Sequence, residues 1–87
     1  MKQAQNSVGI MYESGQGGVA KDPKEAVKWY RKAAEQGDAA SQFNLGRMYE
    51  NGLGGLQRNR NDAVQWYRRA AQQGQLDAQK ALKRLGV

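Results

Sequence analysis

The 87-residue chain contains no cysteine, no histidine and only one proline. Without cysteine it can form no disulfide and can offer no thiolate to a metal. The lack of both cysteine and histidine also excludes the usual nucleophile–base pairs and the nitrogen and sulfur metal sites. The serines have no evident activating base, and the carboxylates occupy positions that suit helix caps and helix surfaces. We therefore expect no enzyme, no catalytic or metal-binding residues and no cofactor.

Long apolar runs are missing as well. No stretch approaches the roughly 20 apolar residues of a membrane span, and the opening segment MKQAQNSVG lacks the apolar region of a signal peptide. The sequence therefore predicts no membrane span. It leaves the compartment open: the periplasm or the exterior if a signal peptide has been removed, and the cytoplasm otherwise. The formal net charge of +6 favours partners of acidic character.

What the sequence does contain is an internal repeat. With a shift of 37 residues and no gap, segment 5–37 aligns with segment 42–74, and about half of the aligned positions are identical. Self-similarity at a period of roughly 20–50 residues is typical of stacked-repeat proteins. Such proteins bury their recurring positions against neighbouring units and bind partners on the extended surface that remains. The repeat therefore predicts a binding surface, but it does not name the partner.

Each unit reads as a helix, a glycine-rich turn and a second helix. In the first unit, apolar residues from Ala4 to Tyr12 recur at helical spacing, and a run of glycines then ends the helix. Asp22 and Pro23 are typical of the next helix start, and Gly37 ends that helix. The pattern therefore predicts a helical hairpin as the repeating element.

The whole chain, residues 1–87, is predicted to be a single repeat domain. Repeat one covers about 4–37, repeat two covers about 41–74, and a helix over about 76–85 opens a third unit. This layout predicts five helices in about two and a half repeats.

Ten of the recurring residues are expected to build the core. A glycine inside a helix costs about 1 kcal/mol relative to alanine, so two such glycines indicate the close approach of a partner helix. Seen alone, the Trp-Tyr pairs resemble aromatic residues that stack on a substrate. Beside paired alanines and at helical spacing, they are expected to anchor the core between repeats. The structural set comprises Gly9, Tyr12, Trp29, Tyr30, Ala33, Gly46, Tyr49, Trp66, Tyr67 and Ala70.

The third unit departs from the glycine pattern. Lys83 stands at the position of Gly9 and Gly46, so we expect no second helix to press against it. The helix over about 76–85 is therefore expected to cap the array and to lie near the natural C-terminus, with a polar outer face. The first helix shows no comparable polar cap. A homo-oligomer contact through the N-terminal face therefore stays open.

These motifs resemble a known repeat family. The pattern L-G-x-M-Y-x-x-G-x-G followed by A-V-x-W-Y-x-x-A-A-x-x-G is similar to the SLR (Sel-one-like repeat) family, a relative of the tetratricopeptide repeat with a longer turn. The resemblance implies an all-α fold, a right-handed α-α superhelix (solenoid) whose concave face is lined by the first helix of each unit. Family members mostly act as adaptors for protein complexes, many of them in bacterial envelopes. The resemblance therefore implies a protein or peptide partner.

The resemblance also indicates which residues face the groove. Two of them are apolar where the repeated core pattern does not require it, and two arginines one repeat apart would form a basic strip. Such a surface suits a peptide with carboxylates, or a peptide C-terminus. The alternative is an ordinary mixed solvent face on which Phe43 contributes to the core. The predicted partner-binding residues are Asn6, Ile10, Phe43, Arg47, Glu50, Lys80 and Arg84.

A second basic cluster lies on the second helices, at Lys24, Lys28, Arg31, Lys32, Arg68 and Arg69. A solvated outer surface explains most of it. Nucleic-acid binding is the rival interpretation, weakened by the interspersed acids and by the scarcity of exposed aromatics. Three functions stay open, in order of preference. They are a protein-interaction module or adaptor, a structural or self-assembling fragment of a larger repeat array, and a nucleic-acid-binding protein.

Overall fold

The computed structural model describes residues 2–87, which form five α-helices and no strand. The predicted all-α fold with five helices is therefore confirmed. No helix in this range is long and apolar enough to cross a membrane. The helices are α1 (Lys2–Ser14), α2 (Pro23–Glu35), α3 (Ala39–Asn51), α4 (Arg60–Gln72) and α5 (Leu76–Leu85).

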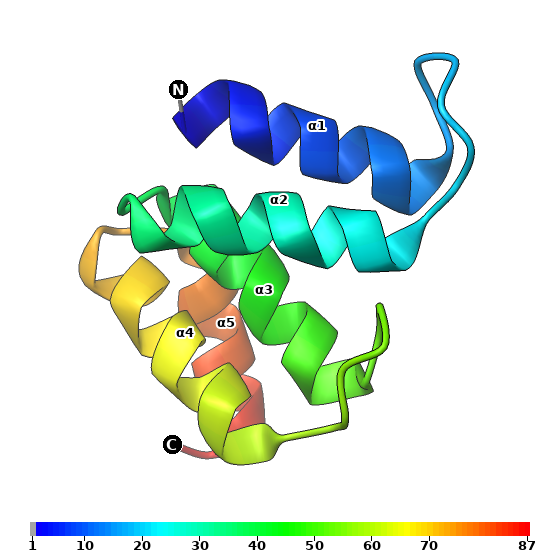
Figure 1. The fold of residues 1–87 in the computed structure, drawn as a ribbon. Coiled ribbons are helices and arrows are strands. Elements are labelled where there is room, and N and C mark those ends of the chain that lie inside the picture. The colour runs from blue at the N-terminus through cyan, green and yellow to red at the C-terminus, as the bar shows by residue number, and fades with distance from the viewer. Residues whose placement is uncertain (1) are drawn as a thin grey trace.

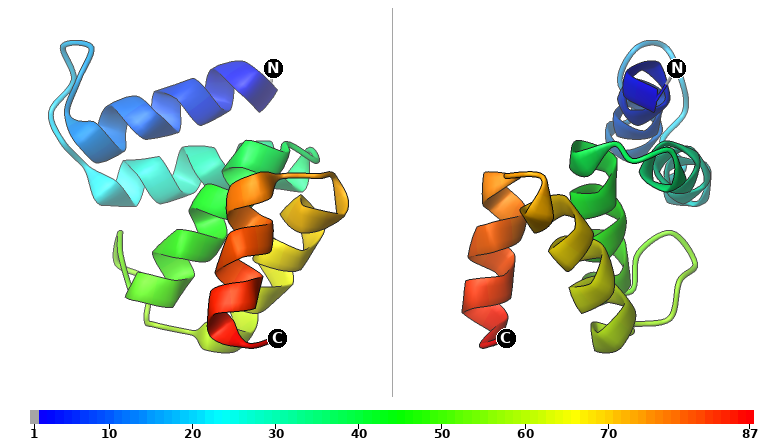
Figure 2. Two further views of the ribbon diagram at one scale, coloured as in Figure 1. Left: turned by 180° about the vertical axis from the view of Figure 1, so that it is seen from behind. Right: turned by 90° about the vertical axis from the view of Figure 1, so that its left-hand side faces the viewer.

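Each helix packs on the next one along the chain. Helices α1 and α2 form one antiparallel hairpin, α3 and α4 form a second one turned relative to the first, and α5 follows on α4 (Figure 1). The N-terminus and the C-terminus lie at opposite ends of the array (Figure 2). This is the stacking of helical hairpins that the 37-residue period predicts.

Two clusters of buried side chains form the core, one between α2 and α3 and one between α4 and α5. The largest fully buried side chains are Tyr30 and Tyr67, which are equivalent positions one repeat apart. Ala33 and Ala70 are fully buried, while Tyr12 and Tyr49 are partly buried against the first cluster. Each repeat thus buries one tyrosine ring at the centre of its helical hairpin.

Gly9 and Gly46 lie where α1 and α3 meet these tyrosine rings. A Cβ atom on Gly9 would lie 2.6 Å from a ring carbon of Tyr30, and one on Gly46 would lie 2.8 Å from a ring carbon of Tyr67. Side chains in a close-packed interior have no room to move aside for such contacts. The helical glycines therefore allow the rings to lie directly against the backbone. Lys83, at the same position of α5, is exposed.

Trp29 and Trp66 are only half-buried, whereas the tyrosine of each Trp-Tyr pair is almost fully buried. Trp66 packs against the first core cluster with part of its surface. A cation three residues on lies over each indole: Lys32 Nζ is 4.8 Å from the centroid of Trp29, and Arg69 Cζ is 4.6 Å from that of Trp66. The tryptophans therefore lie at the edge of the core and form cation–π contacts there.

Helices α1 and α3 each begin two residues before the expected starts at Ala4 and about Ser41. At α3 the reason is Asp38, whose carboxylate accepts hydrogen bonds from the backbone N–H of Ser41 (3.0 Å) and from its hydroxyl (2.7 Å). A carboxylate at this position satisfies an amide that the helix itself leaves unpaired. Asp38 therefore fixes the start of the second repeat.

Replacing Asp38 with alanine is expected to lower the free energy of unfolding by about 1–2 kcal/mol, because α3 loses its N-terminal cap. Urea denaturation followed by circular dichroism measures the change. Glu35→Ala removes an exposed carboxylate at the end of α2 and is the matched control. A loss no larger than that of the control would contradict the capping role.

Candidate functional site

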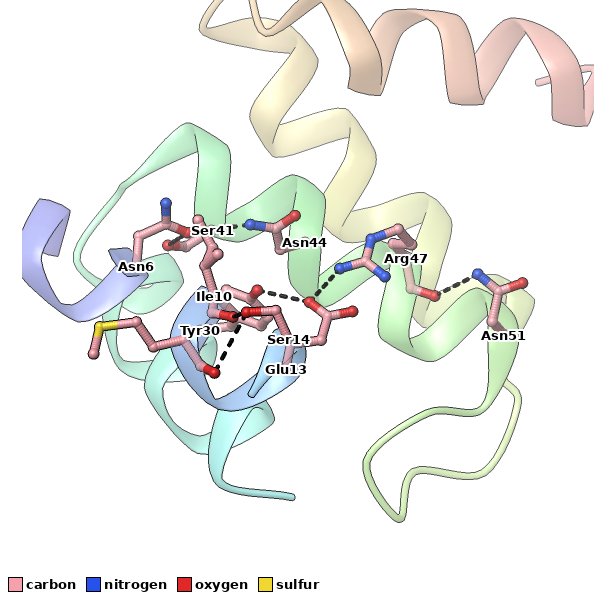
Figure 3. Close-up of polar contacts among 10 residues, drawn as sticks. Asn6, Ile10, Glu13, Ser14, Tyr30, Ser41, Asn44, Arg47 and Asn51 are labelled. Carbon is pink, nitrogen blue, oxygen red and sulfur yellow. Dashed lines mark hydrogen bonds and ion pairs between the residues drawn. The ribbon is translucent and has the colours of Figure 1, made fainter. Parts of the chain in front are cut away.

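Three helices meet through one glutamate in the first repeat. The hydroxyl of Tyr30 in α2 donates to Glu13 Oε1 in α1 at 2.7 Å, and Arg47 Nη2 in α3 donates to the same oxygen at 2.6 Å. Figure 3 shows Glu13 and Arg47 reaching toward each other from their two helices. The side chains of Arg47 and Glu13 are 30% and 25% exposed, so this ion pair is partly shielded from water. We call Glu13, Tyr30 and Arg47 the first triad.

The same arrangement recurs 37 residues further on. The hydroxyl of Tyr67 in α4 donates to Glu50 Oε1 in α3 at 2.6 Å. Arg84 in α5 binds both oxygens of that carboxylate, with Nη1–Oε2 at 2.7 Å and Nη2–Oε1 at 2.8 Å. Such paired hydrogen bonds fix the geometry of both groups more firmly than a single contact does. We call Glu50, Tyr67 and Arg84 the second triad.

Both triads hold their glutamates ionised. Burial by itself would raise the pKa of Glu13, but the hydrogen bonds from Arg47 and Tyr30 and the positive charge of Arg47 outweigh it, so the pKa lies below its ordinary value. Hydrogen bonds from Arg84 lower the pKa of Glu50 to about 2, against the opposing effect of burial. Burial and the hydrogen bonds to the glutamates raise the pKa of both triad tyrosines. At neutral pH each triad is therefore an ion pair with a neutral phenol attached.

The contribution of Glu50 to stability is expected to depend on pH in one direction. Its pKa is lowered from 4.5 to about 2 in the folded state, so its stabilising effect is complete above pH 4.5. That effect is lost as the pH falls toward 2, because Glu50 then becomes protonated in the folded chain as it already is in the unfolded chain. The difference in Tm between wild type and Glu50→Gln should therefore be largest near neutral pH and should shrink in acid. A difference that stays constant over this range would contradict the assignment.

Two pockets open beside the triads. The first has a volume of about 390 Å³ and lies among α1, α2 and α3; the second has a volume of about 420 Å³ and lies among α3, α4 and α5. Arg47 lines both, so the pockets adjoin along the first helices of the units, and we call them together the groove. The first pocket is lined by Ile10, Glu13, Ser14, Tyr30, Asn44 and Arg47. The second is lined by Phe43, Arg47, Glu50, Asn51, Tyr67, Asp77, Lys80, Ala81 and Arg84.

Asn6 is the predicted partner-binding residue that lines neither pocket. Its Oδ1 accepts a hydrogen bond from Asn44 Nδ2 at 3.2 Å and lies 2.8 Å from Ser41 Oγ, whose single proton it shares with Asp38, and it therefore joins α1 to α3 beside the groove (Figure 3). The other six predicted residues do line the groove, namely Ile10, Phe43, Arg47, Glu50, Lys80 and Arg84.

Arg47 and Arg84 do not form the uncompensated basic strip that the sequence suggested. Each is ion-paired to a glutamate of the preceding first helix, Glu13 or Glu50, because the glutamates recur with the same period as the arginines. Arg84 still exposes 58% of its side chain, so part of its guanidinium remains open to solvent.

Phe43 combines the two roles that the sequence left as alternatives. It is half-buried, packs against the second core cluster and lies 5.7 Å, centroid to centroid, from the ring of Tyr67. It also lines the second pocket. Phe43 therefore forms an apolar wall of the groove that is anchored in the core.

Sequence reasoning missed part of the groove. The sequence placed Tyr30 and Tyr67 in the core and gave their hydroxyls no role, and it did not place Ser14, Asn44 or Ala81 in the groove. The shared period held a usable signal for the triads, because glutamate, tyrosine and arginine all recur at a spacing of 37 residues. Asn44 and Ala81 differ between the copies and gave no such signal.

The basic cluster of the second helices is partly engaged by the chain's own aromatics. Arg31 donates to the hydroxyl of Tyr49 at 2.7 Å, while Lys32 and Arg69 stack on the indoles of their own helices. The remaining members of the cluster are exposed. These contacts fit the interpretation of a solvated outer surface, since stacked cations reach phosphates less readily than unengaged ones.

Comparison with protein families decides the classification. The Sel1 repeat family matches residues 2–38 and 39–75, which are the two units of the internal repeat. The chain belongs to the Sel1 repeat family. The suspected SLR resemblance is thereby confirmed, and Sel1 repeats are helical modules that typically serve protein interaction. A comparison with curated proteins found no match.

Solved bacterial structures share the fold. A Sel1 repeat protein from Oxalobacter formigenes is 46% identical with a TM-score of 0.93, over 98% of this chain and 33% of that one. The protein c5321, described as a protective antigen of uropathogenic Escherichia coli with an SLR fold, is 42% identical with a TM-score of 0.85, over 90% of this chain and 16% of that one. The cysteine-rich protein B of Helicobacter pylori is 30% identical with a TM-score of 0.85, over 93% of this chain and 59% of that one.

This Sel1 chain thus spans a third or less of the first two relatives and about three fifths of the third. Sel1 repeats share the hairpin stacking described above, so the comparisons establish the family and the fold of the chain. The activities and partners of those larger proteins do not follow from the similarity.

Proposed function

We propose that this Sel1 chain is a protein-interaction module that binds a peptide or protein segment in the groove of α1, α3 and α5. The observation that carries the proposal is that the two pockets beside the triads adjoin at Arg47 and so form one extended surface across both repeats. An extended groove with apolar walls and charged groups suits a peptide better than a compact small molecule.

The chemistry of the groove favours a partner with both apolar and acidic groups. Ile10 is 44% exposed, and Phe43 presents an anchored ring. Arg84 and Lys80 lie one turn apart on α5 at the rim of the second pocket, where both side chains are exposed. A carboxylate of the partner can bind the open part of the guanidinium while an apolar side chain covers the ring.

The proposal includes no chemical step. The only glutamates in the groove are ionised well below neutral pH and are occupied by hydrogen bonds, so they are poor proton donors. The raised pKa of both triad tyrosines keeps their phenols protonated at neutral pH, so neither supplies a phenolate as a base. The titratable groups of the groove are therefore suited to holding a shape and a charge pattern, and we propose a binding module that is not an enzyme.

A displayed peptide library tests the proposal. The probe is a phage library of random peptides about 16 residues long, which at about 3.3 Å per residue exceeds the 38 Å long dimension of the chain. Wild type is expected to enrich peptides with apolar and acidic residues, and the affinity of a synthesised winner is measured by calorimetry. The variant Ile10→Asp/Lys80→Glu should weaken that affinity by about 30-fold or more, because it removes an exposed aliphatic contact at one end of the groove and reverses the charge of a cation at the other.

The variant Leu76→Asp/Lys28→Glu is the matched control. It introduces the same residue types and the same change of charge at exposed positions that line neither pocket. Equal affinity of the groove variant and this control would reject the groove as the binding site.

A structural or self-assembling role is the second candidate, and one observation favours it. Leu45 and Met48 of α3 are fully buried, whereas Val8 and Met11, their equivalents in α1, are only half-buried. The apolar side of α1 could thus take up a further helix. Analytical ultracentrifugation of wild type and Val8→Asp tests this role, and a monomer at all concentrations would argue against it.

A further inference from the structure

The two pockets of the groove are copies of each other. Every residue that lines the first pocket has its equivalent, 37 residues on, among the residues that line the second. The pairs are Ile10 and Arg47, Glu13 and Glu50, Ser14 and Asn51, Tyr30 and Tyr67, Asn44 and Ala81, and Arg47 and Arg84. The groove is therefore one site built twice, at the pitch of the repeat.

We infer that the groove binds a single extended peptide segment at two subsites. The subsites are equivalent in the repeat but bind groups of different chemistry. The first pocket is the first subsite and takes an uncharged group; the second pocket is the second subsite and takes an apolar side chain flanked by a carboxylate. This inference rests on the proposed function and adds the register and the polarity of the bound segment.

The accessible cations of the two subsites differ. In the first subsite, Glu13 and Arg47 are ion-paired, their charges cancel, and the Arg47 side chain is only 30% exposed. The second subsite adds two cations, Lys80 and Arg84, and two anions, Glu50 and Asp77, so its formal charges balance as well. Arg84 nevertheless exposes 58% of its side chain, and Lys80 is exposed and forms no ion pair with the described residues. An acidic group therefore meets more accessible cations at the second subsite than at the first.

The apolar surfaces differ as well. At the second subsite the small, buried Ala81 lines the pocket together with the rings of Phe43 and Tyr67, so the apolar surface there is mostly aromatic. At the first subsite Asn44 fills the equivalent position, and its amide is held by Asn6 at 3.2 Å. Opposite this amide, Ile10 offers an exposed aliphatic surface, 44% accessible. The first subsite thus suits a small aliphatic or polar side chain, and the second a larger apolar one.

Arg47 couples the two subsites. It belongs to the triad of the first subsite and also stands at the wall of the second. A segment bound at one subsite therefore has its next residues held beside the other, which raises their effective concentration there. One extended chain crossing Arg47 uses both subsites, whereas two separate ligands would lack this advantage.

The test uses the phage-selected peptide described above, synthesised whole and as its acidic and uncharged halves. Two single variants separate the subsites, Ile10→Asp for the first and Lys80→Glu for the second; both positions are exposed. For the whole peptide, each variant is expected to weaken affinity by about tenfold, since each removes one contact region. The acidic half should respond to Lys80→Glu by a similar factor and should be unchanged by Ile10→Asp.

Several results would overturn the inference. The two-subsite inference would be rejected if the acidic half bound as tightly as the whole peptide, or if Ile10→Asp did not change the affinity of the whole peptide. Either result would indicate a single subsite, and the proposed function would stand. Indifference to both variants would reject the proposed function and the inference with it. Self-association that Ile10→Asp abolishes, with no peptide enriched, would assign the groove to a second copy of the chain and also overturn the inference.

Discussion

Replacing Tyr67 with alanine is expected to lower the free energy of unfolding by about 4 kcal/mol, since truncation of a buried aromatic side chain costs roughly 3–5 kcal/mol. The ring is 1% exposed, lies against Gly46 and contacts Phe43 at the centre of the second core cluster. Removing the ring leaves a cavity between α3 and α4. A folded chain of 87 residues has a small free energy of unfolding, so this loss is a large fraction of it. Urea denaturation followed by circular dichroism measures the loss.

The variant Tyr67→Phe separates the ring from the hydroxyl. It keeps the packing and removes only the hydrogen bond to Glu50, 2.6 Å long. Hydrogen bonds to charged groups contribute about 1.5–3 kcal/mol, so phenylalanine should cost clearly less than alanine. If the two variants are equally destabilised, or if phenylalanine costs nothing, Tyr67 does not combine a core role with a role in the triad.

Replacing Gly46 with valine is expected to lower the free energy of unfolding by about 3 kcal/mol, at the upper end of what overpacking a core typically costs. A Cβ atom at this position would lie 2.8 Å from a ring carbon of Tyr67 and 3.2 Å from the carbonyl oxygen of Ala63. Neither a buried ring nor a helix backbone can yield to the added methyl groups without separating α3 from α4. Thermal and urea denaturation together measure the effect.

Lys83→Val is the matched control for this prediction. It introduces the same residue at the equivalent position of α5, where the side chain is exposed. We expect a change within about 0.5 kcal/mol, which reflects helix propensity alone. Comparable losses at the two positions would show that valine is disfavoured there for reasons other than contact with the tyrosine ring.

The fold could be predicted from the sequence because the repeat supplies two nearly independent copies of each local signal. Gly9 and Gly46 occupy the same place in both copies, and a glycine at a fixed place inside a helix has few explanations besides close packing. In the third copy Lys83 replaces this glycine, and the sequence therefore predicted that no second helix packs against α5 there. Periodic features of this kind are set by stacking, which is the same in every unit.

The site was less predictable, because it depends on which side chains meet across neighbouring units. Glu13 and Arg47 are 34 residues apart and lie in different repeats, so no local pattern couples them. Their ion pair changes the expected basic strip into a groove whose charge is mostly balanced. The period predicted a place for the tryptophans in the core between repeats, but it did not predict the cation–π contacts that Lys32 and Arg69 form with them.

The central claim, that the first helices of a Sel1 array bind a peptide segment, is tested most directly by NMR. The ¹⁵N,¹³C-labelled chain is titrated with the phage-selected peptide, and the shifts of backbone and side-chain signals are mapped on the structure. The account predicts that the largest shifts fall on Ile10, Phe43, Arg47 and Ala81, which line the two pockets. Shifts concentrated on Lys28 and Arg68, on the outer faces of α2 and α4, would contradict it.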